Sequence, residues 1–294
     1  MSDTKKSMIN AYHETKRHSN MMFAYNVYPC TIPQDFFFVP MHWQDSVELI
    51  YIKRGEGIVQ VDFETYDAKA GDVFVILPGH IHGLKHKNRM RMEYENIIFD
   101  MSFLGGTQFD LCNQKYWQPL TNEKVTIPTC IDTEHPLNSQ VRAYLDTSDS
   151  LCSKKSQGYE LAVRGNLLII FSMLFQMAET KETSFMNSST EKFKIVLARI
   201  EDGYDKKLTV EGMADECGYS ASHFMRWFKE NTGFGFNGYL IEYRLNHAAE
   251  ELRNSDATIL DIAGESGFDN LSNFNRLFKK RFHKTPSELR KTQV

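Results

Sequence analysis

Residues 258–289, TILDIAGESGFDNLSNFNRLFKKRFHKTPSEL, contain two short helical patterns separated by a glycine turn. The first apolar pattern ends at Gly267, and a second apolar stripe runs from about Leu271 to Phe282. Gly267 suits the left-handed position after a first helix, and Asp269 is the expected N-cap of the next one. Two short helices around such a turn form a helix-turn-helix, whose second helix enters the major groove of DNA.

The same pattern occurs once earlier, in residues 209–233, TVEGMADECGYSASHFMRWFKENTG. Matching residues lie 49 positions apart before the turn and 50 apart after it, so the second turn is one residue longer. The matched pairs include Ala214 with Ala263, Gly218 with Gly267, Phe224 with Phe274, Arg226 with Arg276 and Phe228 with Phe278. A single helix pair is more often an ordinary bundle element. Two copies joined by one amphipathic helix, predicted over about 237–253, are much more specific.

These residues resemble the AraC/XylS family of transcription regulators. The resemblance rests on GYSASHFMRWFKENTG, YLIEYRLNHAAEEL and ILDIAGESGFDNLSNFNRLFKKRFHKTPSELR, and covers roughly the last hundred residues. It implies that two recognition helices enter two successive major-groove segments on one face of double-stranded DNA. The positions that match the family's base-facing positions are Ser222, Met225 and Arg226 in the first unit, and Leu271, Ser272, Asn275 and Arg276 in the second.

The overall charge does not indicate a nucleic-acid binder, because the chain has a net charge of −4. From Thr190 onward basic and acidic residues number 16 each, so the preceding part carries the whole net charge. Basic residues are nevertheless concentrated on and after the second recognition helix, where we expect them to contact phosphates rather than form only a solvated face. They are Arg276, Lys279, Lys280, Arg281 and Lys284.

The N-terminal part shows strand patterns at close spacing. Alternating residues at 47–55 and 57–63 predict a hairpin, and further strands are predicted at 72–78 and 93–100. Short strands separated by turns are typical of a small barrel or jelly roll. Residues 41–57 (MHWQDSVELIYIKRGEG) and 70–84 (AGDVFVILPGHIHGL) resemble the cupin-like sensor domain of many AraC-type regulators.

The cupin resemblance singles out His42, Glu48 and His82 as candidate effector-binding residues. Metal-binding cupins place two histidines and a glutamate on the first motif and one histidine on the second. Gln44 stands here where the second histidine would be, so we predict no metal and no cofactor, although three such ligands can still hold a divalent ion. The alternative is that His42, His80 and His82 line or rim a small-molecule pocket, or merely cap strand ends.

Helical patterns at 135–154 and 158–180 follow the strands. The second has an unusually wide apolar arc, so it is either enclosed within its own domain or buries one face against another subunit. The resemblance favours a homodimer formed through these helices. Polar residues 181–190 predict a linker between a domain at 1–180 and a DNA-binding domain at 191–294. The predicted fold is therefore α+β and multidomain: a cupin-like β-barrel with following helices, then an all-α domain with two helix-turn-helix units.

The favoured function is a transcription regulator that responds to a small molecule, with sugars as the effector class that the resemblance suggests. An activator would also contact RNA polymerase. One alternative is a metal-dependent cupin enzyme fused to a DNA-binding module, but the sequence shows no nucleophile–base pair, phosphate loop or complete metal-ligand set. Another is a DNA-binding protein whose barrel only holds a dimer together. Five scattered cysteines, a polar N-terminus and no long apolar run predict a cytoplasmic protein with no membrane segment.

Overall fold

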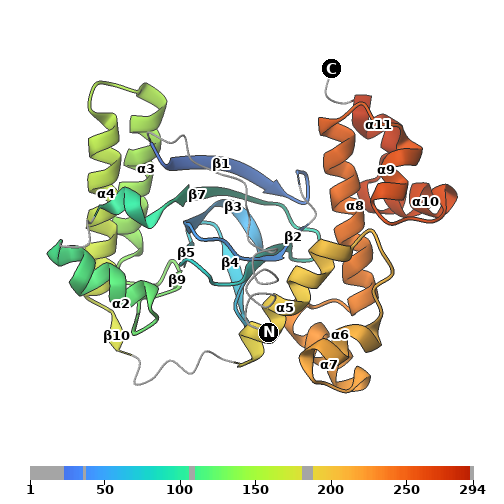
Figure 1. Cartoon of the computed structure of the whole chain (residues 1–294). Helices are drawn as coiled ribbons and strands as arrows, with labels where there is room; N and C mark the ends of the chain where they lie inside the picture. The colour runs from blue at the N-terminus through green and yellow to red at the C-terminus, as the bar shows by residue number, and fades with distance from the viewer. Residues whose placement is uncertain (1–22, 36–37, 106–109, 181–187, 292–294) are drawn as a thin grey trace. The chain divides into compact units, whose positions relative to one another are not determined.

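The structure is a computed structural model of the whole chain and describes residues 23–35, 38–105, 110–180 and 188–291. These residues form two compact units that divide between Thr190 and Glu191 (Figure 1). Helix α5 (Ser188–Gly203) spans the division and begins inside the segment expected to be a linker, whose earlier residues lie outside the described ranges. Each unit is considered by itself below.

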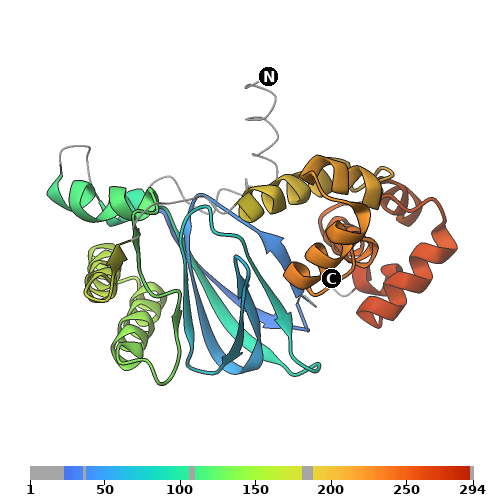
Figure 2. The same ribbon diagram turned by 90° about the horizontal axis from the view of Figure 1, so that it is seen from below.

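The N-terminal unit is built on a sheet whose strands follow the order β1-β7-β3-β5-β9, with β4 and β6 attached to β3 and β2 attached to β6. The strands are β1 (Tyr25–Ile32), β2 (Phe38–His42), β3 (Val47–Val61), β4 (Glu64–Lys69), β5 (Val73–Ile76), β6 (His82–His86), β7 (Met92–Phe99) and β9 (Cys130–Ile131). This arrangement confirms the predicted sheet-rich, cupin-like domain (Figure 2).

Strand β3 pairs with different neighbours along its length and so joins the two halves of the barrel. Its first part pairs with β5 and β7, and its last part pairs with β4 and β6. Gly55 allows this bend, because it has a φ of 75° and a Cβ there would lie 1.8 Å from the carbonyl oxygen of Arg91. The predicted hairpin at Gly55 is therefore wrong. The hairpin turn lies instead at Asp62, between β3 and β4.

Alternate residues of β3 face two different cores. Ile50 and Ile52 pack inside the barrel with Phe74, while Leu49 and Tyr51 pack with the helices on the outer face. Residues two apart on a strand share a face, so Glu48 lies on the barrel side with Ile50. Burial on both faces explains why this part of β3 is an almost continuous apolar run.

Helices α3 (Asn138–Lys154) and α4 (Tyr159–Phe175) cover the outer face of the sheet, as Figures 1 and 2 show. Val163, Leu167 and Phe171 of α4 are fully buried, whereas Leu161 is 76% exposed. The smaller elements of this unit are η1 (Met101–Leu104), the π-helix η2 (Asn113–Trp117), α2 (Gln118–Thr121) and the pair β8 (Val125–Thr126) and β10 (Glu179–Thr180). The wide apolar arc of α4 is thus only partly enclosed within its own unit.

The C-terminal unit is entirely helical in its described residues. Its helices after α5 are α6 (Val210–Cys217), α7 (Ala221–Thr232), α8 (Phe236–Asn254), α9 (Ile259–Glu265), α10 (Leu271–Phe282) and α11 (Pro286–Lys291). Leu245, Ala248 and Leu252 of α8 are buried against α9 and α10, which confirms the predicted connecting helix. Within the described ranges, no helix is long and apolar enough to cross a membrane. The five cysteines are free thiols.

Candidate DNA interface and effector site

Each recognition helix begins at a side-chain cap. Ser220 Oγ accepts a hydrogen bond from the backbone N–H of His223 at the start of α7, and Asn270 Oδ1 accepts one from Asn273 at the start of α10. The expected cap at Asp269 is therefore one residue too early. Gly218 and Gly267 both have positive φ, as predicted for the turns.

The buried faces of α7 and α10 use equivalent aromatic residues. Phe224 and Phe228 are fully buried on α7, and Phe274 and Phe278 are fully buried on α10. The opposite faces are exposed at every position predicted to contact DNA. Those positions are Ser222, Met225, Arg226, Leu271, Ser272, Asn275, Arg276, Lys279 and Lys280. The helix-turn-helix units therefore present these side chains outward, as a major-groove interface requires.

Arg276 has a hydrogen-bonded neighbour that the sequence analysis did not identify. Its Nη2 donates to Asn273 Oδ1 at 2.8 Å, and both residues are exposed on α10. The two lie three positions apart, a spacing at which helix side chains meet, so the signal was present in the sequence. This hydrogen bond with Asn273 restricts the orientation of the Arg276 guanidinium.

Arg281 does not contribute to a phosphate-binding surface, contrary to the sequence analysis. It is buried, its Nε is in close contact with Glu242 Oε2, and its Nη2 donates to Asn246 Oδ1 at 3.3 Å. Burial lowers the pKa of the guanidinium, while Glu242 acts in the opposite direction. Arg281 therefore links α10 to α8 and is a structural residue.

The exposed charges differ between the two recognition helices. Helix α10 carries Arg276, Lys279 and Lys280, and no acidic residue lies within its bounds. Helix α7 carries Arg226 and Lys229, but Glu230 stands at the position that matches Lys280. The second unit thus concentrates positive charge, which favours stronger phosphate contacts there.

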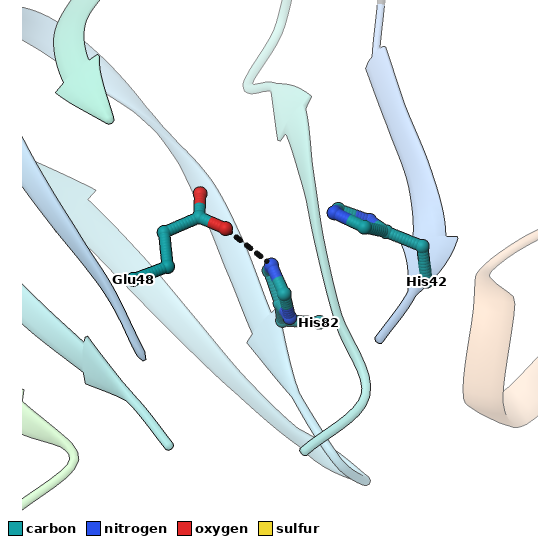
Figure 3. A group of neighbouring side chains, drawn as sticks. All are labelled: His42, Glu48 and His82. Carbon is teal, nitrogen blue, oxygen red and sulfur yellow. Dashed lines mark hydrogen bonds and ion pairs between the residues drawn. The ribbon is translucent and has the colours of Figure 1, made fainter. Parts of the chain in front are cut away.

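His42, Glu48 and His82 meet inside the N-terminal barrel, although they come from three strands (Figure 3). One potential ligand atom from each lies within 4.8 Å of the others. His42 pairs with His82 across β2 and β6 after a register shift, and their ring centroids are 4.2 Å apart. Glu48 and His82 are 1% and 0% exposed, whereas His42 is half-buried.

The carboxylate of Glu48 receives two close contacts through one oxygen. His82 Nε2 lies 2.9 Å from Glu48 Oε2, and Gln44 Nε2 donates to the same oxygen at 3.0 Å. Glu48 Oε1 and Gln44 Oε1 are buried and accept no hydrogen bond from the described residues. Each imidazole places Nδ1 near a backbone carbonyl, that of Pro40 for His42 and that of His80 for His82.

His80 does not join this cluster. Its Nδ1 lies 2.8 Å from Asp62 Oδ2 at the turn between β3 and β4. Phe38, at the start of β2, is buried. The barrel site therefore consists of His42, Gln44, Glu48 and His82.

A separate cavity of about 300 Å³ lies outside the barrel, beside the start of α4. Phe23, Phe103 and Leu161 give it apolar walls, and Glu160 and Arg164 add one charge of each sign. No sequence motif marks this cavity, because its lining comes from three separate segments of the chain. It contains none of the three predicted effector residues.

Two family matches divide the chain as the two units do. Residues 31–118 match AraC-like ligand binding domains, and residues 213–292 match helix-turn-helix domains. The chain is also similar to the HTH-type transcriptional activator RhaS of Escherichia coli (strain K12). That similarity is 23% identity over 263 residues, covering 88% of this chain and 89% of RhaS.

Two solved structures with similar chains are ToxT and the DNA-binding domain of AdpA. ToxT from Vibrio cholerae O395, bound to (E)-4-(8-methylnaphthalen-1-yl)but-3-enoic acid, is 13% identical. The match covers 92% of this chain and 100% of ToxT, with a TM-score of 0.45. The DNA-binding domain of AdpA in complex with a target DNA is 26% identical, covering 33% of this chain and 87% of AdpA, with a TM-score of 0.32.

Proposed function

We propose that this protein, which belongs to the AraC family of transcription regulators, activates transcription when a small molecule binds in its N-terminal barrel. The observation that carries the proposal is the pair of outward-facing recognition helices, α7 and α10, joined in one chain to an AraC-like ligand-binding domain. The similarity to RhaS, which is named a transcriptional activator, supports activation rather than repression. RNA polymerase is the partner that an activator requires.

The exposed side chains supply the chemistry for reading DNA. Arginine can pair with guanine through two hydrogen bonds, so Arg226 and Arg276 are the proposed base-reading residues of the two units. Asn275 carries the amide that recognises adenine in the same way. Lys279 and Lys280 hold charges suited to phosphates, which fix the protein's register without reading sequence.

The barrel site is the proposed effector site. Carboxylate, imidazole and amide groups from Glu48, His82, His42 and Gln44 offer donors and acceptors that suit hydroxyl groups. A sugar or another polyhydroxylated molecule is therefore the proposed effector class. Entry is favoured on the side of His42, because that residue is half-buried whereas Glu48 and His82 are enclosed.

The exposed apolar face of α4 supports a homodimer. Leu161, Leu168 and Ile169 are 76%, 38% and 41% exposed. These residues lie along one side of α4, because positions 168 and 169 follow Leu161 by about two helical turns. Gly165 lies between them on the same side. A glycine in such a face lets a partner helix approach closely, and a second copy of α4 would cover the apolar surface.

Selection from random DNA duplexes tests the proposed function directly. The full-length protein should enrich a site with two sequence elements about one helical turn apart, because its two recognition helices enter successive major-groove segments. The affinity of the protein for the selected duplex should then be measured with each sugar of a library. The sugar that acts as effector should raise or lower this affinity. Enrichment of no sequence above the starting pool would contradict sequence-specific binding, and an unchanged affinity with every sugar would contradict the effector class.

A further inference from the structure

Three potential metal ligands converge in the barrel from three different strands. The cluster joins His42 at the end of β2, Glu48 at the start of β3 and His82 at the start of β6, as Figure 3 shows. A register shift between Val39 and His42 brings His42 into pairing with His82. The strands thus hold the three side chains in fixed positions around one point.

The hydrogen bonds of the two histidines set which nitrogen each ring offers. His42 Nδ1 lies 2.9 Å from the Pro40 carbonyl oxygen, and His82 Nδ1 lies 3.1 Å from the His80 carbonyl oxygen. A carbonyl oxygen only accepts, so each Nδ1 carries a hydrogen. In the neutral ring Nε2 then carries the lone pair. Histidines that bind metals are commonly held in this way, with the other ring nitrogen donating to a carbonyl.

The contact between His82 and Glu48 requires a hydrogen or a cation between the two facing atoms. With Nδ1 protonated, neutral His82 would direct the Nε2 lone pair at Glu48 Oε2, only 2.9 Å away. Both side chains are enclosed, and Glu48 Oε1 accepts no hydrogen bond from the described residues. An unneutralised carboxylate is costly in such a position. Either a hydrogen shared by Glu48 Oε2 and His82 Nε2 or a metal ion therefore lies between these groups.

We infer that His42 Nε2, the Glu48 carboxylate and His82 Nε2 bind a divalent transition-metal ion. Two ligand atoms about 2.1 Å from one ion lie about 3.0–3.4 Å apart, and the observed atoms, all within 4.8 Å of one another, need only a small closure to reach this. Two imidazoles and one carboxylate suit zinc or iron(II) and leave coordination positions open.

Gln44 is a positioning residue for this site rather than a ligand. Its Nε2 donates to Glu48 Oε2 at 3.0 Å, which fixes the plane of the carboxylate. Gln44 stands where metal-binding cupins have a second histidine, which predicted a barrel without a metal, but the three remaining donors suffice. An open position on the ion could also receive an effector oxygen. That step, unlike metal binding itself, rests on the proposed function.

Metal content and zinc titration of the full-length protein, prepared without a polyhistidine tag, test the inference. After chelation and reloading with zinc, mass spectrometry of the elements should find about one ion per chain. Calorimetric titration with zinc chloride should show that His42→Gln, Glu48→Gln and His82→Gln each weaken binding by more than about 100-fold, since even supporting residues contribute 10–100-fold. Gln44→Leu should weaken it by about 10–100-fold.

His86→Gln is the matched control, because His86 lies on the same strand as His82 but outside the cluster. It should bind zinc like the unmodified protein. His42 is half-buried, so its variant remains informative if the Glu48 or His82 variants do not fold. Two results would overturn the inference. One is no zinc uptake by the unmodified protein, and the other is that all three ligand variants bind zinc as tightly as the unmodified protein. The DNA selection described above does not depend on either result, so the two proposals can fail separately.

Discussion

Replacing Arg276 by alanine is the sharpest test of the DNA interface. The side chain is exposed on α10, and its Nη2 donates to Asn273 Oδ1 at 2.8 Å. A good arginine–guanine pair contributes about 1–3 kcal/mol of discrimination. The dissociation constant for the selected duplex should therefore rise about 5- to 160-fold, and the base preference at the contacted position should relax.

Asn273→Ala should have a smaller effect if Asn273 acts by orienting Arg276. A net hydrogen bond contributes about 0.5–1.5 kcal/mol, which corresponds to a loss of about 2- to 13-fold in affinity. Once Arg276 is absent, the same substitution should have no further effect. The double-mutant cycle would then show a coupling energy close to the whole effect of Asn273→Ala.

Fluorescence anisotropy with the selected duplex and with single-base variants measures these effects. Lys280→Ala is the comparison, because loss of a phosphate contact should weaken all duplexes about equally and reduce the salt slope by about 1. Both side chains are exposed, so thermal unfolding should change little. Unchanged affinity and base preference in Arg276→Ala would refute the base contact. Additive effects of Arg276→Ala and Asn273→Ala would refute the orienting role.

Three further substitutions test the two units. Burial raises the pKa of Glu201 to about 7. The native state therefore binds an extra proton between pH 4.5 and 7, and it loses stability as the pH rises through that range. Glu201→Gln should raise the melting temperature at pH 8 but not at pH 4, because the variant cannot ionise at this position. Leu161→Glu should convert a dimer into a folded monomer in sedimentation experiments, because Leu161 is 76% exposed within one subunit, and an unchanged dimer would place the interface elsewhere. Gly55→Ala should lower the melting temperature more than Gly158→Ala. Both glycines have positive φ, but only a Cβ at Gly55 would meet a backbone atom at close range. Equal effects of the two substitutions would show that the approach to Arg91 is unimportant.

The strands of the N-terminal unit were only partly predictable. The apolar patterns at 72–78 and 93–100 correspond to β5 and β7, because both faces of that sheet are buried. Strand β4, with the sequence ETYDAK, lacks this signal because most of it is exposed. The bend at Gly55 was read as a turn, since glycine has the same freedom in a bulge as in a hairpin. Only the approach of Arg91, which directly precedes β7 and follows Gly55 by 36 residues, distinguishes the two.

The turn before α10 shows what the internal repeat could have resolved. Tyr219 matches Phe268 at an offset of 49, whereas Ser220 matches Asn270 at an offset of 50. The additional residue is therefore Asp269, and the cap belongs to the part of the repeat that follows it. Asn270 accepts the hydrogen bond from Asn273 that corresponds to the bond between Ser220 and His223. Chemical preference alone does not decide between Asp269 and Asn270, because aspartate and asparagine cap helices equally well.

The two arginines of α10 mark the limit of sequence reasoning more clearly. Arg276 and Arg281 lie on one helix in the same basic stretch, yet one is exposed and the other is 7% exposed. The difference arises from Glu242 on α8, which lies 39 positions before Arg281 and neutralises it. Helical spacing places position 281 near the buried stripe of Phe274 and Phe278, where a charge requires a partner. Periodicity therefore predicts that Arg281 needs an acidic partner, but only the packing of α8 against α10 identifies it.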